Sequence, residues 1–269
     1  MVTLPSPASD APHEHRGIAE GFGADAERYD RARPTYPPAL TDAIMARSPG
    51  TSILDVGIGT GLSSRGLRDA GCTVLGVEPD ERMAAVARRN GFAVETSRFE
   101  EWDPAGHRVD TIIAGQTWHW VDPVAGARKA AQVLDPDGLL VAFWNAGDPD
   151  PDVAAAFADV YQRIDTGLPF TPWASSESAV SGYGRFVDAT RDGLEQAGGW
   201  SEPERWRFDW EATITTQAWL DQVPTSGGHN RLAPGVLAEL LEGLGDAIDT
   251  LGGSFTMHYA TVAIACTRL

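Results

Sequence analysis

The chain has 269 residues, of which 38 are acidic and 21 basic, so its formal net charge is −17 at pH 7. Proteins that bind nucleic acids hold the phosphate backbone with clustered lysine and arginine side chains. Here Lys129 is the single lysine, and no basic stripe is visible in the sequence. The composition therefore argues against nucleic acid as a partner, and the length fits one large α/β domain or a domain with an insertion.

Residues 1–16 are rich in Pro, Ser, Ala and His. Without an apolar stretch they predict a disordered tail, not a signal peptide. No apolar run in the chain reaches the length of a membrane span. Cys72 and Cys266 lie far apart, with no spacing typical of a metal site or a disulfide framework, and we expect both to be small core residues. These features predict a cytoplasmic protein that does not enter a membrane.

Between residues 37 and 145 the chain alternates between helical and strand patterns. Strict alternation of this kind predicts a parallel sheet with helices on both faces. The expected helices lie near 37–47, 61–70, 80–90 and 123–134, and the expected strands near 52–56, 73–77, 92–95, 109–114 and 139–144.

After Asn145 the composition changes. Residues 166–184 are rich in Gly, Pro and Ser, and a loop of that length in a compact domain is usually functional or disordered. Over 205–212 apolar residues alternate with polar ones, which predicts a half-buried strand. The other expected elements are helices at 151–164, 185–197, 216–222 and 234–251, and a last strand at 255–267.

The most informative segment follows the first expected strand, where Gly57, Gly59 and Gly61 stand at alternate positions. Such glycines permit unusual backbone angles and leave no Cβ between the main chain and a ligand. Glu78 ends the next strand, seventeen residues beyond Gly61. A carboxylate at that point can accept hydrogen bonds from a ribose diol. The segment therefore predicts a nucleoside-binding βαβ unit.

The glycine spacing distinguishes between nucleosides. A dinucleotide fingerprint G-x-G-x-x-G would require a third glycine where this chain has Leu62, and no Gly-Lys-Ser/Thr of a P-loop follows. Asp55 precedes the first glycine by two residues, where an ammonium or sulfonium group gains from a carboxylate and a pyrophosphate does not. A nicotinamide-dependent oxidoreductase is kept as the alternative enzyme class.

With these residues the sequence resembles the class I S-adenosylmethionine-dependent methyltransferases, over roughly residues 22–145. The branch it resembles acts on small molecules and has a UbiE-like or trans-aconitate-methyltransferase-like core. Four further segments are similar to family segments in the same order. They are an N-terminal arm that closes over the cofactor (22–37), a ribose and adenine segment (78–83), a loop beside the adenine (97–100) and a motif after the fourth strand (114–120).

The resemblance implies a Rossmann-like, seven-stranded, mostly parallel sheet with an antiparallel last strand, helices on both faces and a helical cap insertion. It implies a single domain over 17–269, with a cofactor-binding half at 17–145 and the late strands plus the cap at 146–269. The cofactor would be S-adenosyl-L-methionine and the product S-adenosyl-L-homocysteine. The residues expected to bind it are Tyr29, Arg33, Asp55, Gly57, Gly59, Gly61, Glu78, Pro79, Met83, Phe99, Glu100 and Gln116.

The triplet Trp118, His119 and Trp120 follows the fourth strand, at the sheet edge where ligands of open α/β sheets lie. His119 is the candidate catalytic residue, as a base for a hydroxyl acceptor or as an orienting group for a carboxylate acceptor, which needs no base. The tryptophans could equally close the sheet edge as structural residues. The expected acceptor-binding residues are Trp118, Trp120, Trp173 and His229, with Phe170 and Trp219 as further candidates.

The sequence thus predicts O-methylation of a small organic acceptor that carries a hydroxyl or a carboxylate. No metal is expected, because the loop after the fourth strand lacks the carboxylate of catechol-type enzymes. The alternative from a non-enzyme class is a protein that binds S-adenosylmethionine without turnover. Nothing in the sequence indicates an oligomeric state.

Overall fold

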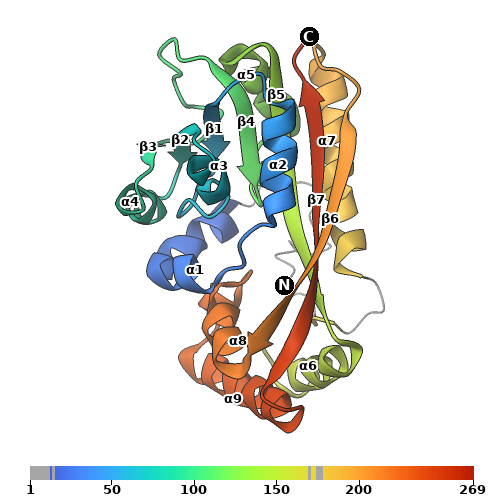
Figure 1. The fold of residues 1–269 in the computed structure, drawn as a ribbon. Helices are drawn as coiled ribbons and strands as arrows, with labels where there is room; N and C mark the ends of the chain where they lie inside the picture. Colours follow the sequence, from blue (N-terminus) through green and yellow to red (C-terminus); the bar gives the residue numbers. More distant parts are fainter. Residues whose placement is uncertain (1–12, 14–15, 169–170, 174–177) are drawn as a thin grey trace.

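One seven-stranded sheet organises the part of the chain that the computed structural model describes, residues 13, 16–168, 171–173 and 178–269. Its order is β3-β2-β1-β4-β5-β7-β6 (Figure 1). The strands from β3 to β5 are parallel, and β7 is antiparallel to both of its neighbours. The predicted fold class is confirmed. The strands are β1 (Ser52–Val56), β2 (Thr73–Glu78), β3 (Ala93–Thr96), β4 (Val109–Gly115), β5 (Leu134–Pro149), β6 (Glu204–Thr215) and β7 (Ser254–Thr267).

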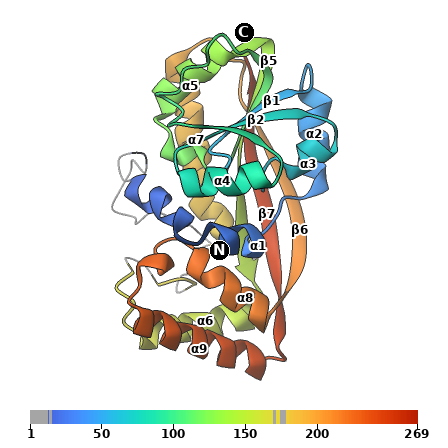
Figure 2. The same cartoon turned by 90° about the vertical axis from the view of Figure 1, so that its left-hand side faces the viewer.

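Helices cover both faces of the parallel strands, so these strands are apolar on both sides. On one face, Leu54 and Ile112 pack with α5 (Pro123–Val133) and α7 (Ala179–Ala197). On the other face, Ile53 and Ile113 pack with α2 (Pro38–Arg47), α3 (Arg65–Asp69) and α4 (Glu81–Arg89). Figure 2 shows α5 and α7 on one side of the sheet and α2 and α3 on the other. Cys72 and Cys266 are buried and free, as core residues.

Strands β5 and β7 run well beyond the parallel strands and carry the cap. The cap helices are α6 (Pro151–Arg163), α8 (Thr216–Gln222) and α9 (Pro234–Thr250), which lie at the opposite end of the molecule from α5 (Figure 1). A third core, formed around Phe157, Trp219 and Phe255, joins these helices to the extended strands. The cap therefore rests on the same sheet as the rest of the fold.

Several element boundaries differ from those predicted. Strand β5 is longer at both ends than the expected 139–144, because residues 145–149 pair with β7 and Leu134 pairs with Val109 across a register irregularity. Helix α7 begins at Ala179, six residues earlier than expected, where the Asp148 carboxylate accepts a hydrogen bond from the Ala179 amide. Helix α3 is shorter than expected, because the preceding residues form turns around the glycines.

Strand β6 shows the predicted alternation, with half-buried Trp206, Phe208 and Trp210 between exposed residues. The N-terminal arm consists of a 3-10 segment (Arg16–Asp25) and α1 (Ala26–Ala32). Most of the predicted disordered tail lies outside the described residues. Within the described part of the chain, no helix combines the length and the apolar character that crossing a membrane requires.

Candidate functional site

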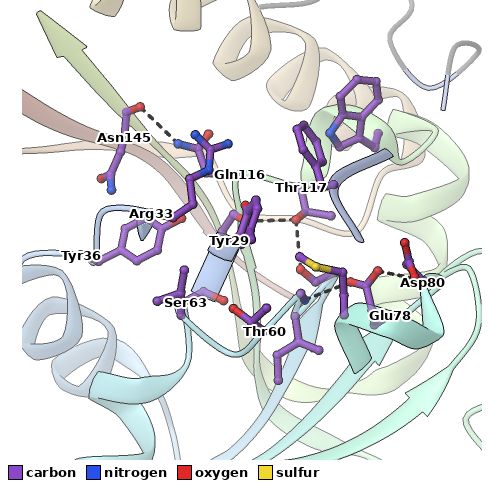
Figure 3. A pocket seen from close by; sticks show the side chains of 18 of the residues that line it. Tyr29, Arg33, Tyr36, Thr60, Ser63, Glu78, Asp80, Gln116, Thr117 and Asn145 are labelled. Atoms are coloured by element: carbon purple, nitrogen blue, oxygen red, sulfur yellow. Dashed lines mark hydrogen bonds between the residues drawn. The ribbon is translucent and has the colours of Figure 1, made fainter. Parts of the chain in front are cut away.

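A cavity lies at the carboxyl ends of β1, β2, β4 and β5, under the N-terminal arm (Figure 3). Ligands of open α/β sheets bind at this edge. The walls come from the arm, from the loops after the parallel strands and, on β7, from Tyr259. The lining residues are Phe22, Tyr29, Arg33, Pro34, Tyr36, Gly57, Ile58, Gly59, Thr60, Leu62, Ser63, Glu78, Pro79, Asp80, Met83, Gly115, Gln116, Thr117, Trp120, Asn145 and Tyr259.

The three glycines all have positive φ, at 69° for Gly57, 59° for Gly59 and 95° for Gly61. Their structural roles differ. A Cβ on Gly59 would have only the Met83 Cε within 4 Å, at 3.5 Å, so its bare main chain faces the cavity. A Cβ on Gly61 would lie 2.4 Å from the Phe92 ring. Gly61 does not line the cavity, and its role in the structure is close packing.

Glu78 forms a buried carboxylate in the cavity wall. Its two oxygens accept hydrogen bonds from the backbone amides of Gly59 and Asp80, each at 3.0 Å. Each oxygen keeps a second lone pair for a ligand. Burial raises the pKa of Glu78 to about 7, against the effect of the two amides. Hydroxyl groups of a ligand that donate hydrogen bonds to Glu78 would therefore stabilise its charged form.

Asp55 is fully buried behind the loop and does not line the cavity, so the expected direct contact is not seen. One oxygen accepts hydrogen bonds from Ser63 Oγ at 2.5 Å and Ser64 Oγ at 2.7 Å. Burial raises the pKa of Asp55 to about 6, opposed by the two serines. Because Ser63 does line the cavity, the structure gives Asp55 the role of holding this serine in place.

Arg33 extends from the end of α1 into the cavity, where its guanidinium lies 5.0 Å from the centre of the Tyr29 ring and 5.9 Å from that of Phe22. Within the described residues no carboxylate pairs with it. An unpaired guanidinium in a cavity wall is a natural partner for an anionic group, which its fork can bind through two hydrogen bonds.

The end of β4 is tied to its neighbours. Gln116 has φ of 59°, a conformation that a non-glycine residue rarely adopts. Its Nε2 donates to the Asn145 carbonyl at 3.2 Å, while its buried Oε1 has no hydrogen-bond partner among the residues described. The Thr117 hydroxyl lies 3.2 Å from the carbonyl of Gly57 and 3.0 Å from that of Gly115. A strained backbone and a buried oxygen without a partner are typical of functional positions.

Phe99 and Glu100 line a smaller adjoining pocket, which shares Gly57, Pro79, Thr117 and Trp120 with the main cavity. The Phe99 ring is buried against the core, and a Glu100 oxygen accepts a hydrogen bond from the backbone amide of Asp122 at 3.0 Å. Phe99 and Glu100, expected beside the adenine, thus lie next to the glycine loop but outside the main cavity.

His119 and Trp118 do not lie in the cavity, which corrects the expected placement. Within the 3-10 turn Trp118–Trp120, Trp120 faces the cavity while the other two side chains point into the core under α7. His119 Nδ1 accepts a hydrogen bond from Trp144 Nε1 at 3.0 Å, and the ring stacks on Phe186 at 4.4 Å. Burial lowers the pKa of His119 to about 3. This geometry supports a structural imidazole and gives no access to an acceptor.

Trp173 and His229 also lie away from the cavity, in the cap. The Trp173 ring packs against Phe157 at 5.3 Å, and the His229 Nε2 lies 2.7 Å from the Tyr161 hydroxyl. Trp219 is fully buried in the same core. Phe170 lies outside the described residues. Of the four residues expected to bind the acceptor, Trp120 is the one that the described cavity includes.

Sequence reasoning missed Tyr36, Asn145 and Tyr259. Asn145 could have been identified from the sequence, because it is a polar residue at the end of a buried apolar run. In the structure its Nδ2 donates a hydrogen bond to the Thr35 carbonyl at 2.9 Å. No local sequence feature identifies Tyr259, because this residue reaches the cavity only through the pairing of β7 with β5. Further lining residues that were not singled out are Phe22, Pro34, Ile58, Thr60, Leu62, Ser63, Asp80, Gly115 and Thr117.

Comparison with known proteins identifies the type of site. Residues 54–142, which contain the glycine loop and Glu78, match the family described as methyltransferase domain. The chain is an S-adenosylmethionine-dependent methyltransferase. An uncharacterized methyltransferase of Mycobacterium tuberculosis is 28% identical over 210 residues, which cover 77% of each chain. A malonyl-[acyl-carrier protein] O-methyltransferase of Enterobacter lignolyticus is 28% identical over 177 residues, covering 64% of this chain and 70% of that protein.

Among solved structures, a putative type II methyltransferase from Anaeromyxobacter dehalogenans has the same fold. Its TM-score is 0.62 at 23% sequence identity, over 87% of this chain and 97% of that one. The cavity also has the features that a nucleoside with a polar tail needs. Besides bare main chain at Gly59 and the Glu78 carboxylate, its wall contains buried oxygens that lack hydrogen-bond partners among the described residues: Thr60 Oγ1, Gln116 Oε1 and the Tyr259 hydroxyl.

Proposed function

We propose that this methyltransferase transfers the methyl group to an oxygen atom of a small organic acceptor bound in the same cavity as the cofactor. The observation that carries the proposal is that Glu78, the glycine loop and Arg33 line one cavity, where Arg33 lies apart from Glu78 (Figure 3) and has no carboxylate partner among the described residues. Glu78 suits the ribose hydroxyls. Arg33 suits a carboxylate.

In this proposal the arm and the loops hold the cofactor along the sheet edge. Glu78 accepts hydrogen bonds from the ribose, and Gly59 offers its main chain to the ligand. Met83 and Pro79 border the nucleoside, beside the adjoining pocket of Phe99 and Glu100. The remaining proposed contacts are Tyr29, Arg33, Gly57 and Gln116, with Asp55 acting through Ser63 and Gly61 through packing.

Bound S-adenosylmethionine supplies a methyl group that its sulfonium has already activated. The protein has to bring an acceptor oxygen into line with that methyl group and keep water out. Tyr29 and Trp120 line the cavity and can exclude water from it. Because His119 is buried in the core, we propose that alignment, and not proton removal by His119, is the main contribution of the protein.

Oxygen as the accepting atom rests on resemblance. One relative, at 28% identity, is named as an O-methyltransferase. The UbiE-like or trans-aconitate-methyltransferase-like branch, a small-molecule acceptor without nucleic acid, a cytoplasmic location and a single domain over 17–269 are part of the same proposal. The net charge of −17 supports the exclusion of nucleic acid.

Calorimetric titration with S-adenosylmethionine, S-adenosylhomocysteine and NAD tests the cofactor. We expect the first two to bind and NAD not to bind. A panel of small alcohols, phenols, carboxylic acids and amines, read by release of S-adenosylhomocysteine and by the mass of the product, tests the acceptor. Methylation of nitrogen or carbon, with no oxygen product, would contradict the proposal.

A further inference from the structure

Tyr259 and Tyr36 line the cavity and are not among the cofactor contacts proposed above. Tyr259 is 3% exposed and lines the cavity; its buried hydroxyl makes no hydrogen bond in the described structure, although the Gln222 side chain lies near enough to lower its pKa. Its ring stacks on Trp210 with the centroids 4.2 Å apart and an angle of 15° between the planes, so the hydroxyl is held rigidly. A buried hydroxyl without a partner loses its hydration on folding and gains nothing in return. Its position in the cavity wall therefore points to a ligand.

Tyr36 also lines the cavity, and its ring packs edge-on against Phe143 at 4.8 Å. Burial raises the pKa of Tyr259 to about 12 and that of Tyr36 well above 10; the positive charge of Arg33 acts against both shifts. Both hydroxyls therefore keep their protons at neutral pH. They can donate hydrogen bonds to an anionic oxygen, within the field of Arg33, but they cannot act as bases.

In the described wall of the cavity, the groups able to remove a proton from an acceptor already have other partners. This described wall contains no histidine, lysine or cysteine. Of its carboxylates, Glu78 holds two backbone amides, and Asp80 forms an ion pair with Arg82 at 2.6 Å. A hydroxyl acceptor would thus find no unoccupied base there, whereas a carboxylate is already a nucleophile at neutral pH.

We infer that the methyl acceptor is a small carboxylic acid, bound as its carboxylate by the Tyr259 hydroxyl close to the positive charge of Arg33. The inference rests on the proposed methyl transfer to oxygen and names the acceptor class. A lone pair of the carboxylate forms the new bond between oxygen and the methyl carbon, and the bond between that carbon and sulfur breaks. Its electron pair stays on sulfur, which gives neutral S-adenosylhomocysteine sulfur and a neutral methyl ester. No proton has to move.

Binding to the complex with S-adenosylhomocysteine tests this without knowledge of the natural acceptor. The probes are phenylacetate and hexanoate, each compared by titration with the amide and the alcohol of the same carbon skeleton. We expect the carboxylates to bind about tenfold or more tightly than their neutral partners, as a charged hydrogen bond provides. Equal or tighter binding of the neutral partners, or no binding of either carboxylate at 10 mM, would overturn the inference.

The variant Tyr259→Phe provides a second test of the inference. It should remove most of the preference for carboxylates, while the affinity for S-adenosylhomocysteine and the melting temperature stay at parent values, because the hydroxyl has no partner to lose. Tyr161→Phe is the matched control, since that hydroxyl lies near His229 in the cap, outside the cavity. An unchanged preference in Tyr259→Phe would also overturn the inference. Failure of the parent protein to bind S-adenosylhomocysteine would instead refute the proposed function, and the inference with it.

Discussion

Arg31 on α1 and Asp221 on α8 form a two-point ion pair across 190 residues of sequence, with Nε to Oδ2 at 2.9 Å and Nη2 to Oδ1 at 3.0 Å. Arg28, one turn earlier, lies 3.2 Å from the same carboxylate. The pair fastens the N-terminal arm to the cap. Helix α1 also carries Tyr29, which lines the cavity. We therefore expect the ion pair to affect how firmly the arm covers the cavity.

Asp221→Asn should therefore loosen the arm. Exposed ion pairs contribute little each, so we expect the affinity for S-adenosylhomocysteine to fall by about two- to fivefold. Amide hydrogen exchange over 21–36 should become faster. The matched control is Glu204→Gln, which removes a two-point pair with Arg47 that is remote from the arm. Equal affinity and exchange in the Asp221 variant would show that the arm closes without this contact.

Glu78 should make cofactor binding depend on pH. Burial raises its pKa from 4.5 to about 7, so the free protein takes up a proton between these values that the unfolded chain lacks. The stability of the free protein from this group thus falls as pH rises from 4.5 through 7. A ligand that donates hydroxyl groups prefers the charged form, so affinity should rise with pH, by about tenfold between pH 6 and 8.

Glu78→Gln should remove this pH dependence and weaken binding by about 1.5–3 kcal/mol for each charged hydrogen bond that it loses. Calorimetry at pH 6, 7 and 8 measures both effects. Glu81→Gln is the control, since Glu81 lies on the neighbouring helix, outside the main cavity, and contacts Thr96 and Arg88. A parent protein with flat affinity over this range would rule out Glu78 as the titrating ligand.

Gly59→Ala and Gly61→Ala should separate binding from folding. At Gly59 the new Cβ has room, so the variant should lose about 1–2 kcal/mol of stability to its positive φ and bind S-adenosylhomocysteine much more weakly. At Gly61 the Cβ would collide with Phe92, so the loss of stability should be larger and the folded fraction should still bind. Denaturant unfolding measures the stability of each variant, and calorimetry measures its affinity for S-adenosylhomocysteine. The reverse ranking would place the ligand against Gly61.

His119→Ala should destabilise the protein without impairing its chemistry. The Trp144 Nε1 loses its acceptor in a buried place, which costs about 1–3 kcal/mol. Activity for each folded molecule, normalised by the folded fraction, should remain at the parent value once an acceptor is known. A loss of turnover with full cofactor affinity and an unchanged melting temperature would restore His119 as a base.

The pH dependence of stability offers a separate check on His119. Its pKa is lowered from 6.5 to about 3 by burial, so the unfolded chain binds a proton that the folded protein excludes. The stability from this group is present above pH 6.5 and is lost as pH falls toward 3. His119→Ala should lose that acid sensitivity.

The predicted site residues that line the cavity are placed there by local sequence features. The turn at Gly57 and Gly59 and the acid at Glu78 are set by a strand, a glycine pattern and the end of the next strand, all within a few tens of residues. The expected placement of His119 in the cavity was wrong, because a 3-10 turn directs successive side chains differently. The sequence does not indicate that Trp120 is the residue of this turn that faces the cavity.

Long-range placement explains the other errors. Tyr259 enters the cavity because β7 pairs with β5 in a register that sets it opposite Gly147, more than a hundred residues earlier. Trp173 and His229 were expected over the sheet edge, but their apolar surroundings in the cap offer more burial than an open cavity does. Neither the register nor the cap core can be read from spacing.

The long pairing of β5 with β7 also limits how this enzyme can admit its ligands. The two strands remain in register from Leu139 opposite Thr267 to Pro149 opposite Met257, through both the cofactor half and the base of the cap. A hinge between these halves would have to break that ladder in its middle. We therefore expect the two parts to move together, and the N-terminal arm to be the described segment that opens when cofactor and product exchange.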